Sequence, residues 1–574
     1  MPLGKTWNIK PASSFASFLS RQAGITPLQA QLLINRGISE PEEADFFMNP
    51  RLSNIPDPMN FKGMKEALFV ILRCIETGAK ITIFGDYDAD GLTSTALLEN
   101  FFSNLGIKVS HYIPDRLKEG YGLNSEAIKR IAGDGTKLII TVDCGISNGK
   151  EISLAISLGM DVIITDHHQI PEGFQPVCPV VNPNQKDCLF PFKNLAGVGI
   201  AFFLSVAIRA ALREKGLFRI NPEPDLREYL DLVALGTVAD RVPLLDQNRI
   251  LVASGMETMS RSRWAGLVAM MEVADISPSG MSSEDIAFRL APRLNAPGRI
   301  GNPETGIKLL TVKDPLYARE LAFDMDRTNE TRQSLEKDIF CEIEEIIRSE
   351  YPVDKKRVLV FSGENWHRGV LGIVASRLVE RYHRPSIIMN IQDGMAVGSG
   401  RSMHGFDLFG ALSQISHVFE RFGGHKYAAG FALKSDRVDF LRKELERIAL
   451  LPEAGFKDED MVPRVEIDSE LALKEINFEM VRHIRALSPF GEGNPEPLFL
   501  ARSLKVHSSR IIRDRHLSMR VGQGKTIFDA IGFNFSDTCP SNGESVDMVF
   551  TPEVNFWQGH ERIKLRITDL KRAV

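Results

Sequence analysis

The sequence predicts a multi-domain α/β protein that ends in a small β-barrel, and three observations carry this prediction. The chain has 574 residues, which is too long for one hydrophobic core and suggests three or four domains. From residue 81 onward, short apolar runs alternate with helical segments, which is typical of a parallel sheet covered on both faces. After about residue 462, short strand-like runs follow one another with turn residues between them.

The first 60 residues and the domain after them differ in pattern. Residues 1–60 carry helical patterning and are predicted to form an N-terminal helical cap on the next domain. Residues 61–312 are predicted to form a doubly wound parallel-sheet domain, with strand runs such as ITIF at 81, KLIITV at 137 and DVIIT at 161. Because these runs lack polar alternation, we expect helices on both faces of the sheet.

A long connecting helix is predicted over residues 313–350. From Pro315 to Glu350 the chain has no glycine and no interior proline, and apolar residues recur at helical spacing. One continuous helix would be ~54 Å long at about 1.5 Å per residue. The alternative is two helices with a kink near Thr328 and Asn329. Either arrangement would hold two domains apart across a cleft.

Two further domains complete the predicted architecture. Residues 351–455 repeat the α/β pattern, beginning with RVLVFSG at 357 and a helix from Val370 to Tyr382. Residues 456–574 hold five short strand-like runs, the pattern of an OB-fold β-barrel.

Composition bounds the class of protein. The hydrophobic share of 43% and the charged share of 25% are ordinary for a globular chain, and the net charge of -5 neither indicates nor excludes a nucleic-acid partner. The six cysteines lie far apart without a CxxC pair, which argues against disulfides and zinc knuckles. The longest uncharged apolar run, Leu195 to Ile208, is too short to cross a bilayer and is predicted to be a buried helix. We therefore expect a cytoplasmic protein that does not bind or span a membrane.

Three aspartates at alternate positions follow the first strand run, in IFGDYDADG. Two such charges ~4 Å apart repel by ~4 kcal/mol at an effective dielectric constant near ~20. The cluster of Asp86, Asp88 and Asp90 therefore needs protonation, wide separation or a cation.

Further runs that we interpret as strands also end in candidate metal ligands. KLIITV is followed by Asp143, DVIIT by the triplet from Asp166 to His168, and DLVALGTVA by Asp240. Taken singly, each of these acids is more simply a helix cap or a turn residue. Because the carboxyl ends of parallel strands meet at one edge of a sheet, their agreement favours a shared site.

The combined set predicts a two-metal centre. The predicted metal ligands are Asp86, Asp88, Asp90, Asp143, His167 and Asp240. They are too many for one ion with bound water and fit a pair of ions, with Asp143 as the bridging carboxylate because it lies in the central part of the pattern. Carboxylate-rich sites with one imidazole favour Mn²⁺ or Mg²⁺, and Cys144 is expected to point into the core behind the strand end.

Such a centre activates water for in-line attack at phosphorus, so the predicted chemistry is hydrolysis of a phosphoester or phosphoanhydride. We expect Asp143 and His167 to act in catalysis through the ions. His168 is predicted to contact a phosphate oxygen or to protonate a leaving group. The alternative for His168 is a structural hydrogen bond to a backbone carbonyl.

These motifs resemble those of a known family. DYDADG at 86, VDCG at 142, DHH at 166 and VAD at 238 resemble the successive motifs of the DHH phosphoesterase superfamily, and FGGHKYAAG at 422 resembles the DHHA1 domain that accompanies it. Stretches such as YIPDRLKEGYGLN and APRLNAPGRIG are most similar to the bacterial exonucleases of that superfamily that are specific for single-stranded DNA.

The resemblance implies a two-metal exonuclease that degrades single-stranded DNA from 5′ to 3′ into nucleoside 5′-monophosphates, in DNA recombination and repair. It also implies single-stranded-DNA-binding protein and a RecQ-type helicase as partners, and a monomer is expected. By position, the six predicted ligands fall where the family binds its two ions. His168 falls at the scissile phosphate, and Arg116, Ser399 and Arg401 fall at the 5′ end of the strand.

Other basic residues are predicted to contact the strand. Arg293 and Arg299 lie in a segment rich in proline and glycine that is expected to be a loop, Arg368 precedes an expected helix N-terminus, and His425 follows two glycines that permit close backbone approach. The alternative for each arginine is a solvated surface position.

The predicted barrel has a basic segment at 501–520. Arg510, Arg513 and Arg515 are predicted DNA contacts there, in a run whose other cations are Arg502, Lys505 and Arg520 and whose single acid is Asp514. Phe528, Phe533 and Trp557 are candidates for base stacking, although packing in the core is the simpler interpretation for most of them.

Two other functions remain open from the sequence. One is a phosphodiesterase of short oligonucleotides or cyclic dinucleotides, against which the terminal barrel argues. The other is a non-catalytic replication accessory factor that binds single strands, against which the full set of metal ligands argues.

Overall fold

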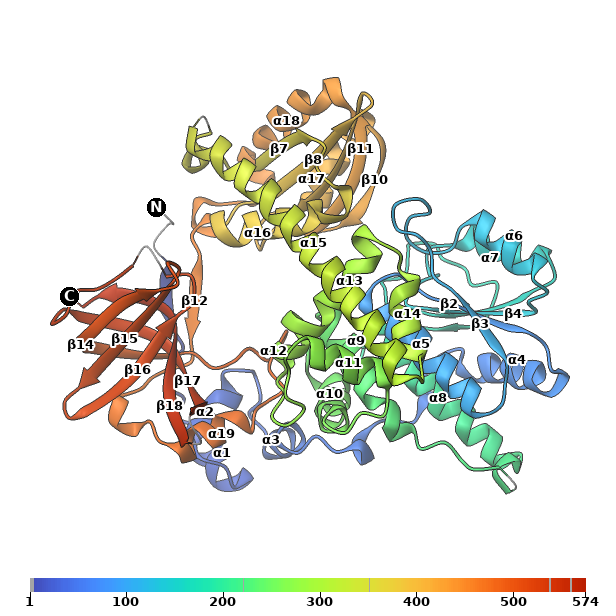
Figure 1. Ribbon diagram of the computed structural model, residues 1–574, viewed down its shortest axis with the longest axis horizontal. Coiled ribbons are helices and arrows are strands. Elements are labelled where there is room, and N and C mark those ends of the chain that lie inside the picture. The colour runs from blue at the N-terminus through green and yellow to red at the C-terminus, as the bar shows by residue number, and fades with distance from the viewer. Residues whose placement is uncertain (1–4, 220, 350, 536–537, 558–559, 574) are drawn as a thin grey trace. The chain divides into compact units, whose positions relative to one another are not determined.

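A computed structural model of the chain describes residues 5–219, 221–349, 351–535, 538–557 and 560–573 (Figure 1). For Phe556 and Trp557 only the backbone is described, so the predicted stacking role of Trp557 lies outside the described side chains.

The chain forms two compact units. The sheet unit comprises Pro56–Asp240 and Gly255–Pro463. The barrel unit comprises Thr6–Ile55, Arg241–Ser254 and Arg464–Val574. Each unit has a hydrophobic core of its own.

The first sheet of the sheet unit is parallel throughout, as predicted. Its strands are β2 (Ile81–Phe84), β3 (Val109–Tyr112), β4 (Leu138–Val142), β5 (Asp161–Thr165) and β6 (Val180–Val181). They lie in the order β3-β2-β4-β5-β6 with all neighbours parallel. The chain leaves β2 on one side for β3 and returns to the other side for β4, so the strand order reverses at β2, and ligands bind at such reversals.

Helices cover both faces of this sheet, which confirms the doubly wound fold. They are α4 (Met64–Thr77), α5 (Ala89–Asn104), α6 (Ser125–Gly133), α7 (Gly149–Ser157) and α8 (Gly197–Glu214). Helices α6 and α7 pack against Phe84, Ile139, Val162 and Ile164 on one face. Helices α5 and α8 pack on each other and on β4, and cover the other face because strand side chains alternate. The run 195–208 is therefore a buried helix, as expected.

A helical segment follows, and here two predictions are wrong. The segment interpreted as the strand DLVALGTVA is helix α9 (Leu230–Ala239). Residues 230–238 are buried on every side, and a short, wholly apolar run gives no periodicity that separates a buried helix from a strand. Arg293 and Arg299 lie in helix α13 (Ala291–Ile300) and not in a loop, since Pro297 is accommodated inside the helix. The other helices here are α10 (Asp246–Met259), α11 (Ala265–Val273), α12 (Ser283–Asp285), the π-turn η5 (Ile286–Leu290) and α14 (Glu304–Thr311).

The predicted long helix is continuous. Helix α15 (Pro315–Ser349) runs for 35 residues without interruption, so the two-helix alternative is wrong (Figure 1). Beyond it lies a second sheet, of strands β7 (Leu359–Glu364), β8 (Ser386–Gln392), β9 (Met395–Arg401), β10 (Phe419–His425) and β11 (Ala428–Lys434). Their order is β10-β11-β9-β8-β7, parallel only between β7 and β8, and helices α16 (Leu371–Tyr382), α17 (Leu408–Gln414) and α18 (Val438–Leu450) accompany them.

The barrel unit holds a closed five-stranded barrel, as predicted. Its strands are β14 (Phe499–Ile512), β15 (His516–Gln523), β16 (Thr526–Gly532), β17 (Ser545–Trp557) and β18 (His560–Arg572). Pairing runs β14-β15-β16-β18-β17, and pairing of β17 back to β14 closes the ring. The shorter elements β12 (Arg464–Ile467), β13 (Ser469–Glu470) and α19 (Phe478–Arg485) lead into it.

The N-terminal helices, predicted as a cap on the domain that follows them in sequence, belong to the barrel unit. Strand β1 (Thr6–Ile9) pairs in parallel with β12. Helices α1 (Ala16–Ala23), α2 (Pro27–Ile34) and α3 (Pro41–Met48) contribute apolar side chains to the barrel core. Helical patterning shows that a helix has an apolar face, but it does not show which distant element covers that face.

A buried arginine fastens these helices to the rest of the barrel unit. Arg249 is 1% exposed and donates hydrogen bonds to the backbone carbonyls of Phe47, Leu487 and Ser488. Among the described residues, no helix is both long enough and apolar enough to cross a membrane.

Candidate metal centre

The DYDADG segment forms the turn between β2 and α5. Asp88 caps α5, since its Oδ1 accepts from the backbone N–H groups of Asp90 (3.0 Å) and Gly91 (3.1 Å). A Cβ on Gly91 would lie 2.6 Å from the backbone of Asp86, so only glycine permits this turn. Asp86 and Asp90 are buried as a result, at 2% and 1% exposure.

The start of α8 holds Asp90. The backbone N–H groups of Gly197 and Val198 donate to its two carboxylate oxygens at 2.6 and 2.8 Å. A Cβ on Gly197 would lie 2.8 Å from Cβ of Asp143, so the glycine lets the helix approach the acids closely. The run that sequence analysis identified only as a buried helix therefore also places a helix N-terminus, with its positive dipole end, against the carboxylates.

Asp143 lies directly after the central strand β4. Its backbone has a φ of 59°, in the left-handed region that non-glycine residues rarely adopt. The hydroxyl of Tyr121 donates to its carbonyl oxygen at 3.0 Å, and its N–H donates to the carbonyl of Thr165 at 3.1 Å. Cys144 is fully buried in the core behind the strand end, as expected.

The histidines follow β5 and are fixed by their neighbours. Asp166 is buried and accepts from the N–H groups of Ile146 and His168 (both 3.0 Å) and from Nδ1 of His168 (2.8 Å). Asn184 donates to the carbonyl of His167 at 2.7 Å. These bonds turn both imidazoles toward the sheet edge.

The six predicted ligands converge. Nε2 of His167 lies 3.1 Å from Oδ1 of Asp143, 3.6 Å from Oδ2 of Asp240 and 4.0 Å from Oδ2 of Asp90. Asp86, Asp88 and Asp143 form a second group whose oxygens lie within 4.8 Å of one another. Asp240 reaches the centre from the C-terminal end of α9, although the sequence predicted a strand there.

Several polar atoms of this cluster are buried without a hydrogen-bond partner in the described part of the chain. They are Oδ1 of Asp86, Oδ1 of Asp143, Oδ2 of Asp240 and Nε2 of His167. The 3.1 Å approach of this Nε2 to Oδ1 of Asp143 does not have the geometry of a hydrogen bond. A buried carboxylate oxygen without a partner is costly, and a cation at these atoms would offset that cost. Oxygen donors with one imidazole are the ligand set of Mn²⁺ or Mg²⁺, so the residues fit a divalent metal centre.

The pKa shifts reflect the same crowding. Burial, together with neighbouring carboxylates, raises the pKa of Asp143 and Asp240 well above the usual range and that of Asp90 to about 7. Burial and then the charge of His168 lower the pKa of His167 to about 4. A neutral imidazole is the form that binds a metal.

Three of the predicted DNA-contacting arginines, Arg116, Arg299 and Arg401, lie close together. Burial and then Arg116 lower the pKa of Arg299 to about 10, with Arg401 adding to the effect, and the Arg116 guanidinium lies 5.2 Å from the Tyr87 ring centroid. In the described residues, none of the three has a carboxylate within ion-pair distance. Such a cluster of cations attracts an anion.

Ser399 and Arg401 belong to β9 and lie beside the first turn of α16. A Cβ added to Gly372, in the first turn of that helix, would lie 3.0 Å from both Oγ of Ser399 and Nη2 of Arg401. Nη1 of Arg401 donates to Oγ of Ser399 at 3.2 Å. The predicted 5′-end contacts therefore meet at a helix N-terminus, which favours anions.

The remaining predicted contacts of the sheet unit are placed differently. Arg293 is engaged by Asp326 of α15 at 2.8 Å and is not among the clustered arginines. Arg368 is exposed, with Nη2 3.5 Å from Oε1 of Gln392. His425 is exposed at the end of β10, the edge strand of its sheet.

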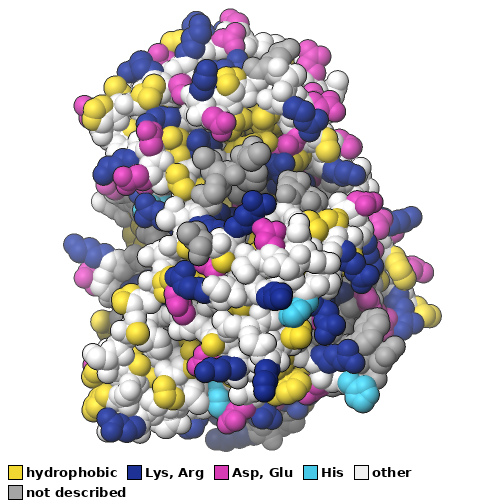
Figure 2. All heavy atoms as spheres, turned by 90° about the vertical axis from the view of Figure 1, so that its left-hand side faces the viewer, with side chains coloured by type: hydrophobic (Ala, Val, Ile, Leu, Met, Phe, Trp, Pro, Cys, Tyr) yellow, Lys and Arg dark blue, Asp and Glu magenta, His cyan; other side chains and the backbone are white. Residues whose placement is uncertain are grey.

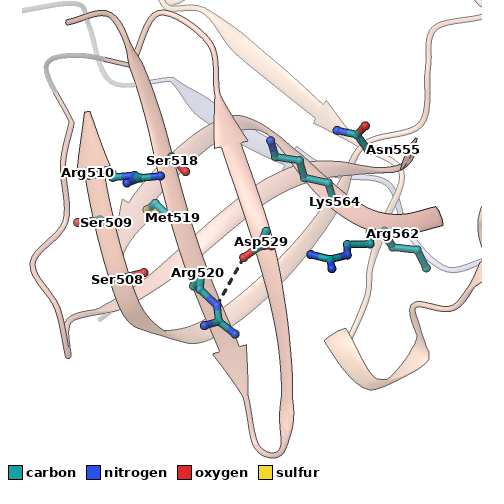
Figure 3. A pocket seen from close by; sticks show the side chains of 11 residues that line it. Ser508, Ser509, Arg510, Ser518, Met519, Arg520, Asp529, Asn555, Arg562 and Lys564 are labelled. Carbon is teal, nitrogen blue, oxygen red and sulfur yellow. Dashed lines mark ion pairs between the residues drawn. The ribbon is translucent and has the colours of Figure 1, made fainter. Parts of the chain in front are cut away.

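The barrel carries a basic groove of about 580 Å³ (Figure 3). Arg510 lines it together with Arg520 from β15 and with Arg562 and Lys564 from β18. Figure 2 shows Lys and Arg side chains spread among Asp and Glu side chains over the face that it draws. Arg562 and Lys564 were missed from the sequence, although their alternation in RIKLR on a predicted strand places both on one face.

The other basic residues of 501–520 do not share one role. Arg513 and Arg515 are exposed in the turn between β14 and β15, where Nε of Arg515 donates to Asn534 at 2.6 Å. Arg502 is paired with Glu470 at 2.7 Å. Phe533 is 51% exposed, whereas Phe528 packs partly against the barrel core.

Several positioning residues escaped sequence analysis. Oδ1 of Asn295 accepts from the N–H of Ala89 at 2.7 Å, and a Cβ on Gly298 would lie 2.5 Å from the carbonyl oxygen of Tyr87. Helix α13 therefore supports the acidic turn from about 200 residues away in sequence. No local pattern marks these contacts, although a glycine within a helical segment can signal a close approach.

Comparison with known proteins agrees with this geometry. A parallel sheet with an acid and imidazole edge, followed by a second sheet, defines the DHH class of proteins. The model of the DHH family, N-terminal domain, matches residues 80–237, that of the DHHA1 domain matches 355–450, and that of the RecJ OB domain matches 467–569.

The chain belongs to the RecJ family. It is 38% identical to the single-stranded-DNA-specific exonuclease RecJ of Bacillus subtilis over 98% of this chain and 70% of that protein, and 35% identical to the Escherichia coli protein of the same name over 96% of each. The crystal structure of RecJ in complex with Mn²⁺ from Thermus thermophilus matches with a TM-score of 0.84 and 30% identity, over 99% of this chain and 80% of that one. A Mg²⁺ complex from the same organism matches with a TM-score of 0.76 and 28% identity, over 99% and 79%.

Proposed function

We propose that this chain is an exonuclease specific for single-stranded DNA. It uses two ions of Mn²⁺ or Mg²⁺ and degrades the strand from 5′ to 3′ into nucleoside 5′-monophosphates, in DNA recombination and repair. The observation that carries the proposal is the convergence of Asp86, Asp143, Asp240 and His167 with buried polar atoms that have no partner among the described residues. The names of its RecJ relatives support the substrate.

Six residues would hold the two ions. These ligands are Asp86, Asp88, Asp90, Asp143, His167 and Asp240. A bound pair of divalent cations would supply the activation of water and the neutralisation of phosphate charge that phosphodiester hydrolysis needs. Gly197 and Val198 keep Asp90 oriented toward the site through their backbone N–H groups.

His168 acts on the phosphate itself. Its Nδ1 is held by Asp166 at 2.8 Å, so its Nε2 is the ring nitrogen left for the substrate. In the protonated ring both nitrogens carry hydrogen, and Nε2 would donate to a non-bridging phosphate oxygen or give its proton to the leaving oxygen. Burial alone would lower the pKa of His168, but hydrogen bonding to Asp166 outweighs burial and raises that pKa.

The clustered arginines would bind the 5′ end of the strand. Arg116, Arg299 and Arg401 have no carboxylate within ion-pair distance in the described residues, and Ser399 adds a hydroxyl beside the N-terminus of α16. Arg368 and His425 are exposed and available to the following nucleotides. A terminal anion recognised by several cations would favour an end over an internal position.

The barrel groove would bind the strand beyond the site. Arg510, Arg562 and Lys564 line it with serine hydroxyls, which suits a sugar-phosphate backbone (Figure 3). Arg520 also lines it and is paired with Asp529 at 3.5 Å. Arg513 and Arg515, exposed at the β14–β15 turn, would add further phosphate contacts. A monomer in the cytoplasm, with single-stranded-DNA-binding protein and a RecQ-type helicase as partners, completes the proposal.

Digestion of end-labelled strands tests it. With Mn²⁺ or Mg²⁺, a single strand labelled at its 5′ end should lose the label at once as a mononucleotide, whereas a 3′ label should remain on shortening oligomers. The variant Asp143→Ala should release neither. A matched control is Asp187→Ala, since Asp187 also has a left-handed φ, of 63°, but is exposed. Release of the 3′ label first, or activity confined to dinucleotides, would contradict the proposal.

A further inference from the structure

A loop at the mouth of the metal centre carries a tyrosine between two glycines. Gly120 and Gly122 have φ values of 87° and 78°, in the left-handed region that glycine adopts without strain. A Cβ on Gly122 would lie 2.6 Å from Oδ1 of Asn148, so the loop also lies close to the start of α7. This conformation directs the side chain of Tyr121 toward the sheet edge.

Both ends of this loop are tied to the domain. Glu119 accepts from the hydroxyl of Tyr112 at 2.6 Å, from the N–H of Asp115 at 2.7 Å and from Nδ2 of Asn124 at 3.2 Å. The anchors are independent of Tyr121, so its removal need not release the loop.

The hydroxyl of Tyr121 makes two contacts in the site. It donates to the carbonyl oxygen of Asp143 at 3.0 Å and lies 3.2 Å from Nδ1 of His168. The Tyr121 ring meets the His168 ring edge to face, with centroids 5.6 Å apart. Tyr121 nevertheless stays 46% exposed, so it lies at the surface of the site and not within a packed core.

These contacts fix which ring nitrogen of His168 faces the substrate. The hydroxyl proton of Tyr121 is committed to the carbonyl of Asp143, so toward His168 the phenol oxygen is an acceptor. Asp166, the other partner of Nδ1, is also an acceptor. Nδ1 therefore donates, and Nε2 faces the substrate.

We propose that Tyr121 is a positioning residue that sets the orientation of His168, with Nε2 toward the scissile phosphate. This inference rests on the proposed nuclease function. Arg116 lies on the same loop, so the segment that would meet the 5′ end also orients the imidazole that acts on the phosphate.

A double-mutant cycle tests the proposal. Tyr121→Phe keeps the ring and removes both hydroxyl contacts. It should lower kcat for a single strand about 10-fold, the effect of one lost hydrogen bond, and leave KM and the Mn²⁺ dependence within about 2-fold. In a His168→Ala background, measured in single turnovers with excess enzyme, Tyr121→Phe should cost nothing further. Tyr317→Phe, at an exposed tyrosine on α15, is the matched control and should match the native protein.

Three results would overturn the inference. One is a native kcat in Tyr121→Phe, and another is an equal loss in both backgrounds, which would mean that Tyr121 does not act through His168. The third is a higher Mn²⁺ requirement, which would mean that it acts through Asp143. Should His168→Ala be too slow to measure, a raised KM with native kcat in Tyr121→Phe decides against the inference. Failure of the native protein to cut any strand would instead refute the proposed function.

Discussion

Two clusters of acidic and imidazole groups lie in the same sheet domain. In the first cluster the side chains serve as one another's hydrogen-bond and charge partners, and in the second they do not. In the first, Nδ1 of His111 lies 2.8 Å from Glu99 and Nε2 lies 3.2 Å from Glu304. Burial alone would lower the pKa of His111, but the hydrogen bonds to Glu304 and Glu99 raise it to about 9. A protonated imidazole between two carboxylates needs no further partner, and it ties β3 to α5 and α14.

The sheet edge is the opposite case. His167 has a pKa lowered to about 4, first by burial and then by the charge of His168, so it is neutral and cannot balance the acids around it. Asp86, Asp143 and Asp240 each keep a buried oxygen without a partner in the described residues. The balance of charge within a cluster, and not its composition, therefore separates a structural cluster from a metal centre.

The largest effect is expected from removal of the Asp143 carboxylate. Asp143→Asn should reduce exonuclease activity by about 1,000-fold or more, because it removes a carboxylate that would hold the two proposed ions. In EDTA the same variant should melt about 3 °C higher than the native protein, since a neutral amide replaces an acid whose ionisation is unfavourable at this site. Thermal melting with and without Mn²⁺ measures both effects, and the shift caused by Mn²⁺ should be lost in the variant.

The control for that variant is Asp187→Asn, at an exposed aspartate with the same left-handed backbone. It should keep native activity and the native Mn²⁺ shift. A lower melting temperature of Asp143→Asn in EDTA would show that the acid edge is satisfied without metal, and the contrast with His111 would disappear.

Sequence predicted the acid edge well because its residues directly follow strands. Asp86, Asp143 and His167 come within two residues of the ends of β2, β4 and β5, and parallel strands bring those ends together. Asp240 was also predicted, but from the wrong element, because an apolar run buried on all sides has no readable period. The wrong element still delivered its last residue to the same place.

Arginine contacts were harder to predict because the partner of an arginine depends on tertiary structure. Arg293 and Arg299 lie on the same helix, yet one is paired with Asp326 of α15 and the other is clustered with Arg116 and Arg401. Nothing in their local sequence distinguishes them. The packing of the N-terminal helices on the barrel escaped prediction for the same reason.

Arg293 and Arg299 differ in the same way, since Arg293 has a carboxylate partner and Arg299 has none among the described residues. Arg299→Ala should raise KM for single strands about 10-fold, because it removes a cation that has no carboxylate partner in the described residues. Arg293→Ala should leave KM within about 2-fold and lower the melting temperature by a few degrees, because it breaks the α13–α15 ion pair. Equal effects on KM would mean that pairing does not separate structural from functional arginines.

The barrel groove gives a smaller effect of the same kind. Binding of a long single strand in EDTA should weaken severalfold in the double variant Arg562→Ala with Lys564→Ala. The slope of log affinity against log salt should fall by about 1.4, because two phosphate contacts are lost. Arg502→Ala is the matched control, since Arg502 is already paired with Glu470 and Asp547, and it should change the slope little. An unchanged slope in the double variant would exclude the groove as a binding surface.

The cluster of His111, Glu99 and Glu304 should affect stability in a way that depends on pH. Because the folded pKa of His111 is raised from about 6.5 to about 9, its contribution is complete below about pH 6.5 and is lost as the pH rises through about 9. The loss is about 2 kcal/mol after allowance for partial exposure, which corresponds to a few degrees in melting temperature. In His111→Gln the melting temperature should be lower at pH 6, converge with the native value near pH 10 and respond normally to Mn²⁺. If Mn²⁺ no longer raises the melting temperature of His111→Gln, the two clusters are coupled. Independent clusters would leave that rise unchanged, because the side chains around His111 do not contact an ion bound at the sheet edge.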